Sequence, residues 1–419
     1  MRNIVLITLD SLRSDHCSFL GYRRETTPII DKLARNSLYF ENAIAPSSGT
    51  PESMTALFSG EHSALDQGLI DPQERRKELL KRKLLPEILS EKGYASGAIV
   101  PNAFVSSYFG FNKGFSYFQD FLSEGSEKGL MDGLHQKIFE GFAQNKKWAP
   151  PLRNAYNLIR KKEVFRPWED YYENILGWVD KVNKPFFLWV LLIDTHFPYL
   201  APKKFRKWGN LLDMYLYNWK VQAAKWYPDF TEKERQKLIN AYDDSILYAD
   251  AFVKRLWRDL RCEDPIFMIH ADHGDGFGEH GFYMHNPPLL YEELIHVPLI
   301  IYNSDNRGKI ENPISLINLL PMTLDLAKGK NSSVSTNLFN KEWVISKVFE
   351  NRKRRLAIRM KNWKFITGQK DKDELYDLRI DPSEQESIIE KHPKLVDEMK
   401  KITSNHIACE RSRIKNNLL

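Results

Sequence analysis

The stretch IVLITLD at residues 4–10 decides the fold, because a continuous apolar run rich in β-branched residues ends there in a carboxylate. Such a run predicts a strand that is buried on both faces. Two more runs share this character, FFLWVLLI at 186–193 and PIFMIH at 265–270, and the second leads directly into an Asp-His pair. Helical spacing between the runs favours an α/β fold with a large, mostly parallel sheet between helices. Ligands bind such sheets at the carboxyl ends of the strands.

Local end signals define further elements. Pro51 suits the first position of a helix that continues over 52–58. Thr231 and Glu234 form a capping-box pattern, which predicts a long helix to about residue 260. Strands are also expected at 39–43, 95–100 and 297–302, and helices at 27–35 and 84–92.

The chain is predicted to form a catalytic domain over residues 1–342 and a C-terminal subdomain over 343–419. Two segments of the first domain, at about 121–180 and 200–230, are rich in Lys, Arg, Trp and Tyr and are expected to be helical insertions. Beyond residue 343, short strands interspersed with charge predict a small antiparallel sheet, and a helical tail is expected from residue 393.

Composition and charge limit the classes of function. The 419 residues are 42% hydrophobic and 28% charged with a net charge of +6, which favours a soluble protein with a small anionic substrate over one that binds nucleic acid. Three scattered cysteines predict no disulfide framework and favour a cytoplasmic location. No leader precedes the first strand, and the longest apolar run is too short to cross a bilayer, so contact with a membrane surface is compatible but spanning is not expected. The oligomeric state stays open.

Four residues form a candidate metal site: Asp10, Thr50, Asp272 and His273. Three oxygens and one imidazole favour Mn²⁺ or Zn²⁺, and Ca²⁺ or Mg²⁺ are also compatible. Thr50 would lie at a helix N-terminus, where free N–H groups attract an anion, and a bound cation would lower the pKa of its hydroxyl. Each residue alone has an ordinary alternative as a cap or turn residue. Together they predict a site for displacement at phosphorus or sulfur.

Six motifs, in order along the chain, resemble those of the sulfatases in the alkaline phosphatase superfamily. The most specific is DHGD followed by GEHG at 272–281. The others are LDSLRSD at 9–15, TPESMTALFSG at 50–60, DTHFPY at 194–199, YEE with VPLI at 291–300, and ELYDL with Asp381-Pro382 at 374–382. The resemblance covers most of the chain and implies an alkaline-phosphatase-like sandwich with a small C-terminal subdomain and the activity of a metal-dependent ester hydrolase.

The departures from the sulfatase pattern bear on the substrate. Thr50 stands where sulfatases carry the Cys or Ser that becomes formylglycine, and Met54 stands where they carry an Arg. A threonine cannot become that aldehyde, and a Thr nucleophile resembles the phosphodiesterases and phosphoryl-group transferases of the superfamily. We therefore expect a phosphodiester or phosphonate ester substrate and a covalent Thr50 intermediate. The alternatives are a sulfatase without formylglycine, a phosphoryl-group transferase and, more remotely, a non-catalytic module that binds metal and anions.

The resemblance also implies roles around the metal. Ser11 replaces a second aspartate and His273 replaces an Asn, which shifts the ligand set from calcium towards a transition metal. His196 falls on the segment that contacts the transferred group, and His285 falls where sulfatases carry a Lys. We expect one metal with these two histidines as catalytic residues, and a second metal between them is the alternative.

Two further residues are predicted to bind substrate. Asn102 lies where sulfatases place basic substrate contacts, and its alternative role is that of a turn residue. Arg13 follows the first aspartate, and its alternative role is that of a structural partner of Asp15. The cations and aromatic residues of 121–180 suit a phosphate-bearing or lipid headgroup. His62, His280 and His296 are expected to be structural.

Overall fold

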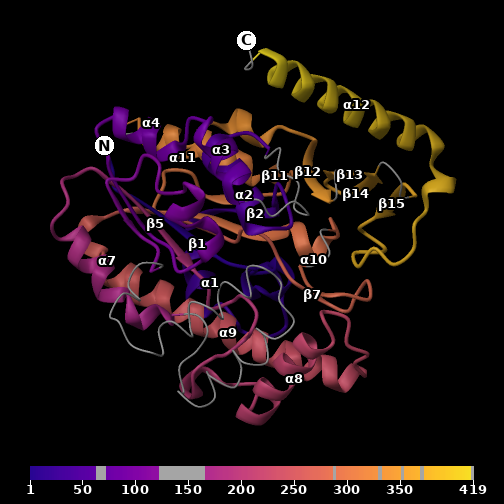
Figure 1. Ribbon diagram of the computed structural model, residues 1–419, viewed down its shortest axis with the longest axis horizontal. Helices are drawn as coiled ribbons and strands as arrows, with labels where there is room; N and C mark the ends of the chain where they lie inside the picture. Colours follow the sequence, from indigo (N-terminus) through magenta and orange to yellow (C-terminus); the bar gives the residue numbers. More distant parts are fainter. Residues whose placement is uncertain are drawn as a thin grey trace.

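A mixed sheet lies at the centre of the computed structural model, which describes residues 1–62, 72–121, 166–285, 289–328, 333–350, 353–368 and 372–416 (Figure 1). The order of its strands is β10-β2-β9-β6-β1-β5-β3-β4, and β11 pairs with β2 beside this path. The strands are β1 (Ile4–Leu9), β2 (Ser37–Ile44), β3 (Ala95–Ile99), β4 (Tyr117–Gln119), β5 (Phe186–Leu192), β6 (Ile266–His270), β9 (His296–Tyr302), β10 (Gly308–Ile310) and β11 (Ile314–Ser315).

Parallel pairing dominates this sheet, as the sequence predicts. Within the described ranges, β9 alone runs antiparallel to its neighbours, β2 and β6. The central strand β1 pairs in parallel with β5 and β6, and Thr8 lies beside His270. Two residues further along, Asp10 and Asp272 therefore leave the same edge of the sheet side by side.

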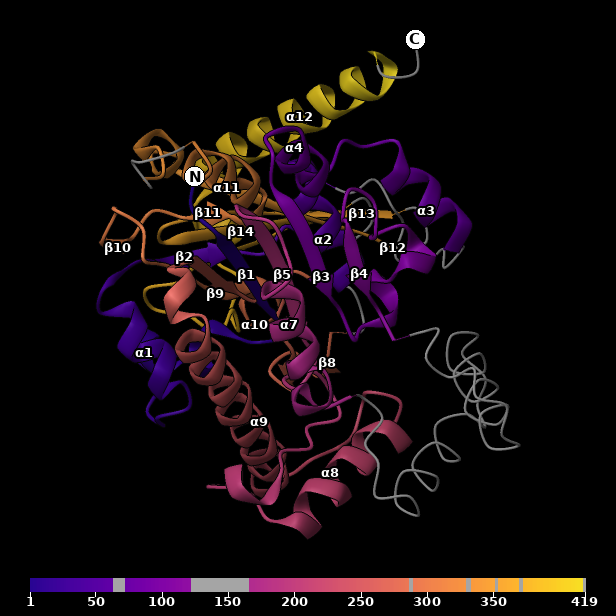
Figure 2. The same ribbon diagram turned by 90° about the vertical axis from the view of Figure 1, so that its left-hand side faces the viewer.

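Helices cover both faces of the sheet (Figures 1 and 2). One layer contains α2 (Thr50–Ser59), α4 (Leu85–Glu91) and α11 (Leu319–Leu326), and the other contains α1 (Pro28–Ala34), α7 (Tyr172–Val179) and α9 (Glu232–Asp259). Because both faces are covered, every residue of β1, β5 and β6 is buried. In the described parts of the chain, the remaining helices of eight or more residues are α3 (Pro72–Leu80), α8 (Leu211–Ala223) and α12 (Pro393–Asn416).

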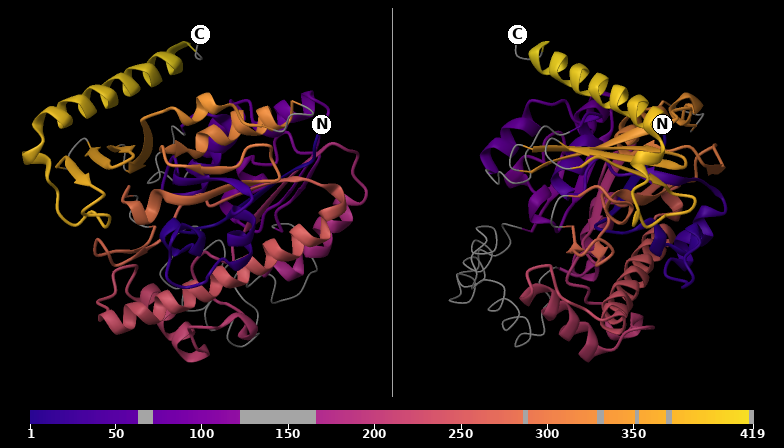
Figure 3. Two further views of the ribbon diagram at one scale, coloured as in Figure 1. Left: turned by 180° about the vertical axis from the view of Figure 1, so that it is seen from behind. Right: turned by 90° about the vertical axis from the view of Figure 1, so that its right-hand side faces the viewer.

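The second sheet is antiparallel and begins at Trp343, the residue at which the predicted C-terminal subdomain starts. Its strands are β12 (Trp343–Glu350), β13 (Lys353–Met360), β14 (Trp363–Gly368) and β15 (Glu374–Asp377), in that order. Figure 3 shows α12 lying along this sheet, and apolar side chains such as Phe365 and Met399 join the two. The small sheet and the helical tail are confirmed, whereas the division of the chain at residue 342 stays a prediction.

A buried seam of ion pairs joins the small sheet to α10 (Glu292–Ile295). Lys364 on β14 is fully buried and lies 3.1 Å from a Glu292 carboxylate oxygen and 2.9 Å from one of Glu384. Arg359 on β13 also pairs with Glu292 at 3.1 Å. Burial alone would raise the pKa of Glu292, but the charges of Arg359 and Lys364 outweigh it and hold that pKa well below its usual range. The two cations therefore favour the ionised form of the Glu292 carboxylate.

The described parts of the two predicted insertions each contain a helix, and their assignment as insertions stays a prediction. The first contains α7, although most of it (122–165) lies outside the described residues, and the second contains α8. Among the described residues, none of the helices combines the length and the apolar character needed to cross a bilayer.

Candidate metal centre and active site

The four predicted metal-site residues come together at the carboxyl edge of the sheet. The His273 Nε2 atom lies 3.1 Å from the Thr50 hydroxyl oxygen, 3.6 Å from Asp272 Oδ2 and 3.9 Å from Asp10 Oδ1. One ligand atom from each of Asp10, Asp272 and His273 lies within 4.8 Å of the others. These three side chains are fully buried, and Thr50 is nearly so. The sequence therefore identified residues that the fold assembles.

Neighbouring backbone and hydroxyl groups fix these ligands. Ser11 adopts a left-handed backbone with φ of 64°, and its N–H donates to Asp272 Oδ1 at 3.1 Å. The backbone N–H of His273 donates to the same oxygen at 3.0 Å. Ser53 on α2 donates its hydroxyl to the Asp272 carbonyl oxygen at 2.7 Å, which ties the helix of Thr50 to the Asp-His loop. These hydrogen bonds therefore hold the Asp272 carboxylate and the Asp-His loop in place without help from a metal ion.

The donor set fits a divalent cation. Asp272 Oδ2 is buried and finds no hydrogen-bond partner among the described residues, which is costly unless a cation neutralises it. Burial and the charge of Asp272 raise the pKa of Asp10, as expected for two carboxylates that lack a counter-ion. His273 donates its Nδ1–H to the Gly274 carbonyl oxygen at 2.9 Å, so the Nε2 lone pair faces the carboxylates.

Asn102 also lies at this centre. Its side-chain N–H₂ donates to Asp10 Oδ2 at 2.7 Å, and its oxygen accepts the N–H of Phe104 at 2.9 Å. The amide thus orients a metal-site carboxylate, and its predicted contact with substrate stays a prediction.

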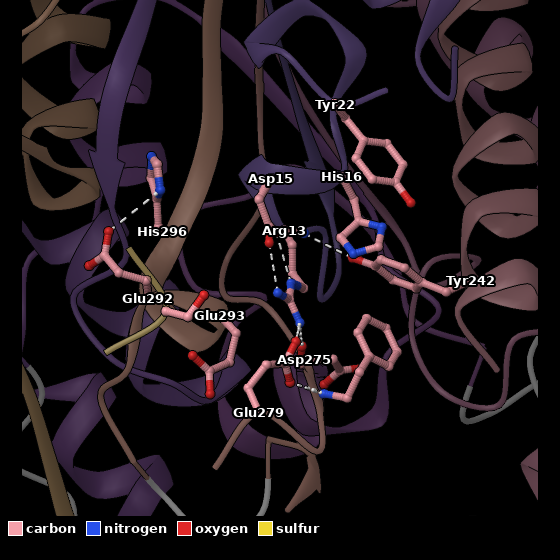
Figure 4. A network of polar contacts seen from close by, with 12 residues as sticks. Arg13, Asp15, His16, Tyr22, Tyr242, Asp275, Glu279, Glu292, Glu293 and His296 are labelled. Atoms are coloured by element: carbon pink, nitrogen blue, oxygen red, sulfur yellow. Dashed lines mark hydrogen bonds and ion pairs between the residues drawn. The ribbon is translucent and has the colours of Figure 1, made fainter. Parts of the chain in front are cut away.

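Arg13 forms ion pairs with other residues of the protein. Figure 4 shows its guanidinium between Asp15 and Glu279, which it pairs with at 2.7 Å each, and it donates to the Asp275 carbonyl oxygen at 2.9 Å. It also lies over the ring of Phe277. These contacts are those expected of the alternative, a structural partner of Asp15 that holds the loop after His273, and the predicted contact of Arg13 with substrate stays a prediction.

His196 and His285 lie beside the metal-site residues. The His285 ring centroid is 4.4 Å from that of His273 and 5.3 Å from that of His196. His196 donates its Nδ1–H to the Phe197 carbonyl oxygen at 2.5 Å. Burial, reinforced by the neighbouring His285, lowers the pKa of His196 to about 4. Its imidazole is therefore neutral at neutral pH, with Nε2 as an acceptor.

Asp275 is a site residue to which sequence reasoning gave no role. Its carboxylate is buried, lies 2.7 Å from His285 Nδ1 and accepts the Tyr199 hydroxyl at 2.8 Å. Burial opposes ionisation, but His285 lowers the pKa of Asp275 below its usual value. The two-stranded hairpin of β7 (Gly276–Phe277) and β8 (Tyr283–Met284) brings residues 275 and 285 together. His273, Asp275 and His285 form a second group with ligand atoms within 4.8 Å of one another.

The three histidines that were expected to be structural make contacts of that kind. His280 stacks on Tyr291 at 3.6 Å between ring centroids, and His280 Nδ1 lies 2.6 Å from a Glu293 oxygen. His296 donates to the Glu41 carbonyl oxygen at 2.8 Å. His62 lies against the ring of His406 on α12.

The family model described as Sulfatase matches residues 2–330 of this chain, which is more than half of its length. The chain belongs to the sulfatase family. This result confirms the predicted family and enzyme class. Sulfatase-family enzymes generally bind a divalent metal ion, and the group formed by Asp10, Asp272 and His273 supplies suitable ligands in this one.

Relatives of this sulfatase-family chain include both transferases and sulfatases. The phosphatidylethanolamine transferase Mcr-1 of Escherichia coli is 23% identical over 318 residues, 73% of this chain and 49% of the relative, so the chain spans about half of that relative's length. An arylsulfatase of Clostridium perfringens is 25% identical over 372 residues, 78% of this chain and 74% of the relative. The crystal structure of a phosphonate monoester hydrolase of Agrobacterium radiobacter matches with a TM-score of 0.70 at 15% identity, over 97% of this chain and 96% of that one. The last likeness confirms the predicted fold.

Proposed function

We propose that this sulfatase-family enzyme cleaves phosphodiesters or phosphonate esters through a covalent adduct on Thr50. The observation that carries the proposal is the placement of the Thr50 hydroxyl, at the first residue of α2 and 3.1 Å from His273 Nε2. Helix N-termini favour anions, so an ester phosphate would be attracted to this oxygen. The printed activities of two relatives, a phosphatidylethanolamine transferase and a phosphonate monoester hydrolase, support phosphorus as the reacting atom.

Asp10, Thr50, Asp272 and His273 would hold the metal, and this mixture of oxygen and nitrogen donors favours Mn²⁺ or Zn²⁺ over Ca²⁺ or Mg²⁺. When bound, the ion would neutralise charge on the ester oxygens and lower the pKa of a nearby hydroxyl. Asn102 keeps the Asp10 carboxylate in place and could donate to an ester oxygen only by giving up that hydrogen bond.

The first half of the reaction forms the adduct. The Thr50 hydroxyl gives its proton to solvent, its oxygen bonds to phosphorus, and the bond between phosphorus and the leaving oxygen breaks. His285 in its doubly protonated form gives the Nε2 proton to that leaving oxygen, while Asp275 retains the hydrogen bond to Nδ1.

The second half breaks the adduct. Water, or the hydroxyl of an acceptor, bonds to phosphorus as the bond from phosphorus to the Thr50 oxygen breaks. Neutral His196 accepts the proton of the attacking oxygen at Nε2, and Thr50 regains a proton from solvent. His196 then releases its proton to solvent and His285 takes one up, which restores the starting state of both imidazoles. Hydrolase and transferase thus differ only in the attacking hydroxyl. The similarity to Mcr-1 favours the transferase as the second candidate.

We also propose a cytoplasmic location for the enzyme, because its exposed thiols Cys262 and Cys409 would stay reduced there.

Turnover of paired p-nitrophenyl esters by protein loaded with Mn²⁺ or Zn²⁺ tests the proposal. The esters are a phosphate monoester, a phosphodiester, a phenylphosphonate and a sulfate. We expect turnover of the phosphodiester or phosphonate, loss of it in Thr50→Ala, and a phosphoryl adduct on Thr50 by mass spectrometry. Thr55→Ala, a buried threonine of the same helix, is the matched control and should stay active. Dominant sulfate turnover would instead support the sulfatase alternative and overturn the preference for phosphorus.

A further inference from the structure

Helix α8 carries apolar side chains on its outer face. Leu212 is 74% exposed, and Leu211 and Trp219 are each 52% exposed. These positions are one, seven and eight residues apart, a spacing that places them on one side of a helix. Tyr227, four residues beyond the helix end, is also 58% exposed. We call Leu211, Leu212 and Trp219 the α8 stripe.

The opposite face of α8 is tied to the active site. Asn218 accepts the N–H of Tyr199 at 2.9 Å and donates to the Tyr199 carbonyl oxygen at 3.0 Å, so it fixes the backbone three residues after His196. Trp226 packs on Phe197, and its carbonyl oxygen accepts the N–H of Tyr283 at 3.0 Å. Both Figure 1 and Figure 2 place α8 beside the hairpin that contains Tyr283. The helix that carries the stripe is therefore joined to the segments of His196 and His285.

The residues that flank the stripe in the sequence carry a net positive charge, although Lys204 lies 3.5 Å from a Glu169 oxygen and Lys207 lies 3.9 Å from a Glu25 oxygen. Residues 201–230 contain six Lys or Arg and two Asp, a net charge of +4 within a chain whose total is +6. The exposed cations Lys203, Lys204 and Lys207 precede α8, and the exposed Lys225 follows it. Leucine and tryptophan on one helix face, with lysines at its borders, suit the interface of an anionic bilayer, because the rings and methyl groups enter the headgroup region while the ammonium groups contact phosphates.

We propose that α8 is a membrane-docking surface that seats the protein peripherally on an anionic bilayer. The stripe supplies the apolar insertion, and the flanking lysines supply the electrostatic attraction. Because Asn218 and Trp226 join α8 to the segments of His196 and His285, docking holds the rim of the active site against the bilayer. The surface binds lipid irrespective of the ester that is cleaved.

Sedimentation with vesicles of phosphatidylcholine, with and without phosphatidylglycerol, tests this proposal. We expect the full-length protein to bind vesicles that contain phosphatidylglycerol, and added salt should weaken that binding. The double variant Leu212→Ser/Trp219→Ser should lower the partition coefficient roughly tenfold or more, because two partly inserted side chains are lost. Ile380→Ser, which removes a 77% exposed apolar residue of the C-terminal region, is the matched control and should bind like the wild type.

Circular dichroism and turnover of a soluble p-nitrophenyl ester, both unchanged in the double variant, would show that α8 remains folded. Sedimentation needs no turnover, so failure of the proposed function and failure of docking are distinguishable. Wild-type protein that ignores anionic vesicles, or a double variant that binds them as well as the wild type, would overturn the proposal. A wild-type dimer that becomes monomeric in the double variant would also overturn it, since the stripe would then bind a second copy.

Discussion

The hydrogen bond between Asp275 and His285 allows a sharp test of the proposed proton donor. Asp275→Asn keeps the shape of the side chain and one oxygen for His285 or Tyr199, but it removes the charge that lies 2.7 Å from the imidazole. A positioned acid contributes about 10²–10⁴-fold to catalysis. We therefore expect a loss of about a hundredfold or more, or ~3 kcal/mol of transition-state stabilisation, for esters whose leaving group needs a proton.

The assay compares two leaving groups in the same metal-loaded protein. p-Nitrophenolate departs without a proton, so kcat for its ester should fall much less in Asp275→Asn than kcat for an unactivated alkyl ester. Metal content, measured by mass spectrometry, should match that of the wild type. Tyr199→Phe is the matched control because it removes the other partner of Asp275, and we expect a stability loss of about 1–3 kcal/mol with a small kinetic effect.

An equal loss on both esters would refute the reasoning, because it would show that Asp275 does not act through the leaving group. If metal content fell in parallel, the group of His273, Asp275 and His285 would instead be a second metal site.

Two other predictions concern the metal and pH. Asp272→Asn should abolish the rise in Tm that Mn²⁺ or Zn²⁺ gives the wild type. Without metal, the variant should be as stable as the wild type or more stable, because one of two buried like charges is removed. A metal-dependent rise in Tm that persists in the variant would contradict the assigned ligand set. For His280, burial lowers the pKa but the bond to Glu293 outweighs it, so the folded-state pKa lies above the ordinary 6.5. The stability this gives is fully present below pH 6.5 and is lost as the pH rises through the folded-state pKa. Urea unfolding across this range should show that the free energy of unfolding of the wild type exceeds that of His280→Gln by roughly 1.5–3 kcal/mol at the acid end, and by less as the pH rises. A difference that stays constant with pH would show that titration of His280 does not contribute.

Much of the fold, and the grouping of residues at the candidate metal site, could be predicted because local signals and strand ends specify them. Buried apolar runs predicted β1, β5 and β6, and parallel neighbours deliver their terminal residues to one edge. The proximity of Asp10 and Asp272 could therefore be predicted from the order of the strands alone. The capping-box pattern likewise located the start of α9, whose N-cap is Thr231.

Contacts that depend on turns could not be predicted in this way. Asp275 was visible in the DHGD motif, but its role depends on a hairpin in which Gly276 pairs with Met284, a register that places 275 opposite 285. The spacing of ten residues around a Gly-rich turn was the available signal. The contact between Arg13 and Glu279 could not be predicted for a similar reason, since it depends on the loop after His273 folding back.

The buried seam has a consequence for the modularity of the chain. Gly274, next to the metal-site residues, donates its N–H to the Leu294 carbonyl oxygen at 2.9 Å, and a Cβ added there would lie 2.1 Å from the Glu293 carbonyl oxygen. The loop is thus pressed against α10, which Lys364 and Arg359 of the small sheet hold by its first residue. Recombination that exchanged the C-terminal sheet for another would have to bring matching cations at both positions. Replacement of the C-terminal sheet would therefore disturb the loop beside the candidate metal site.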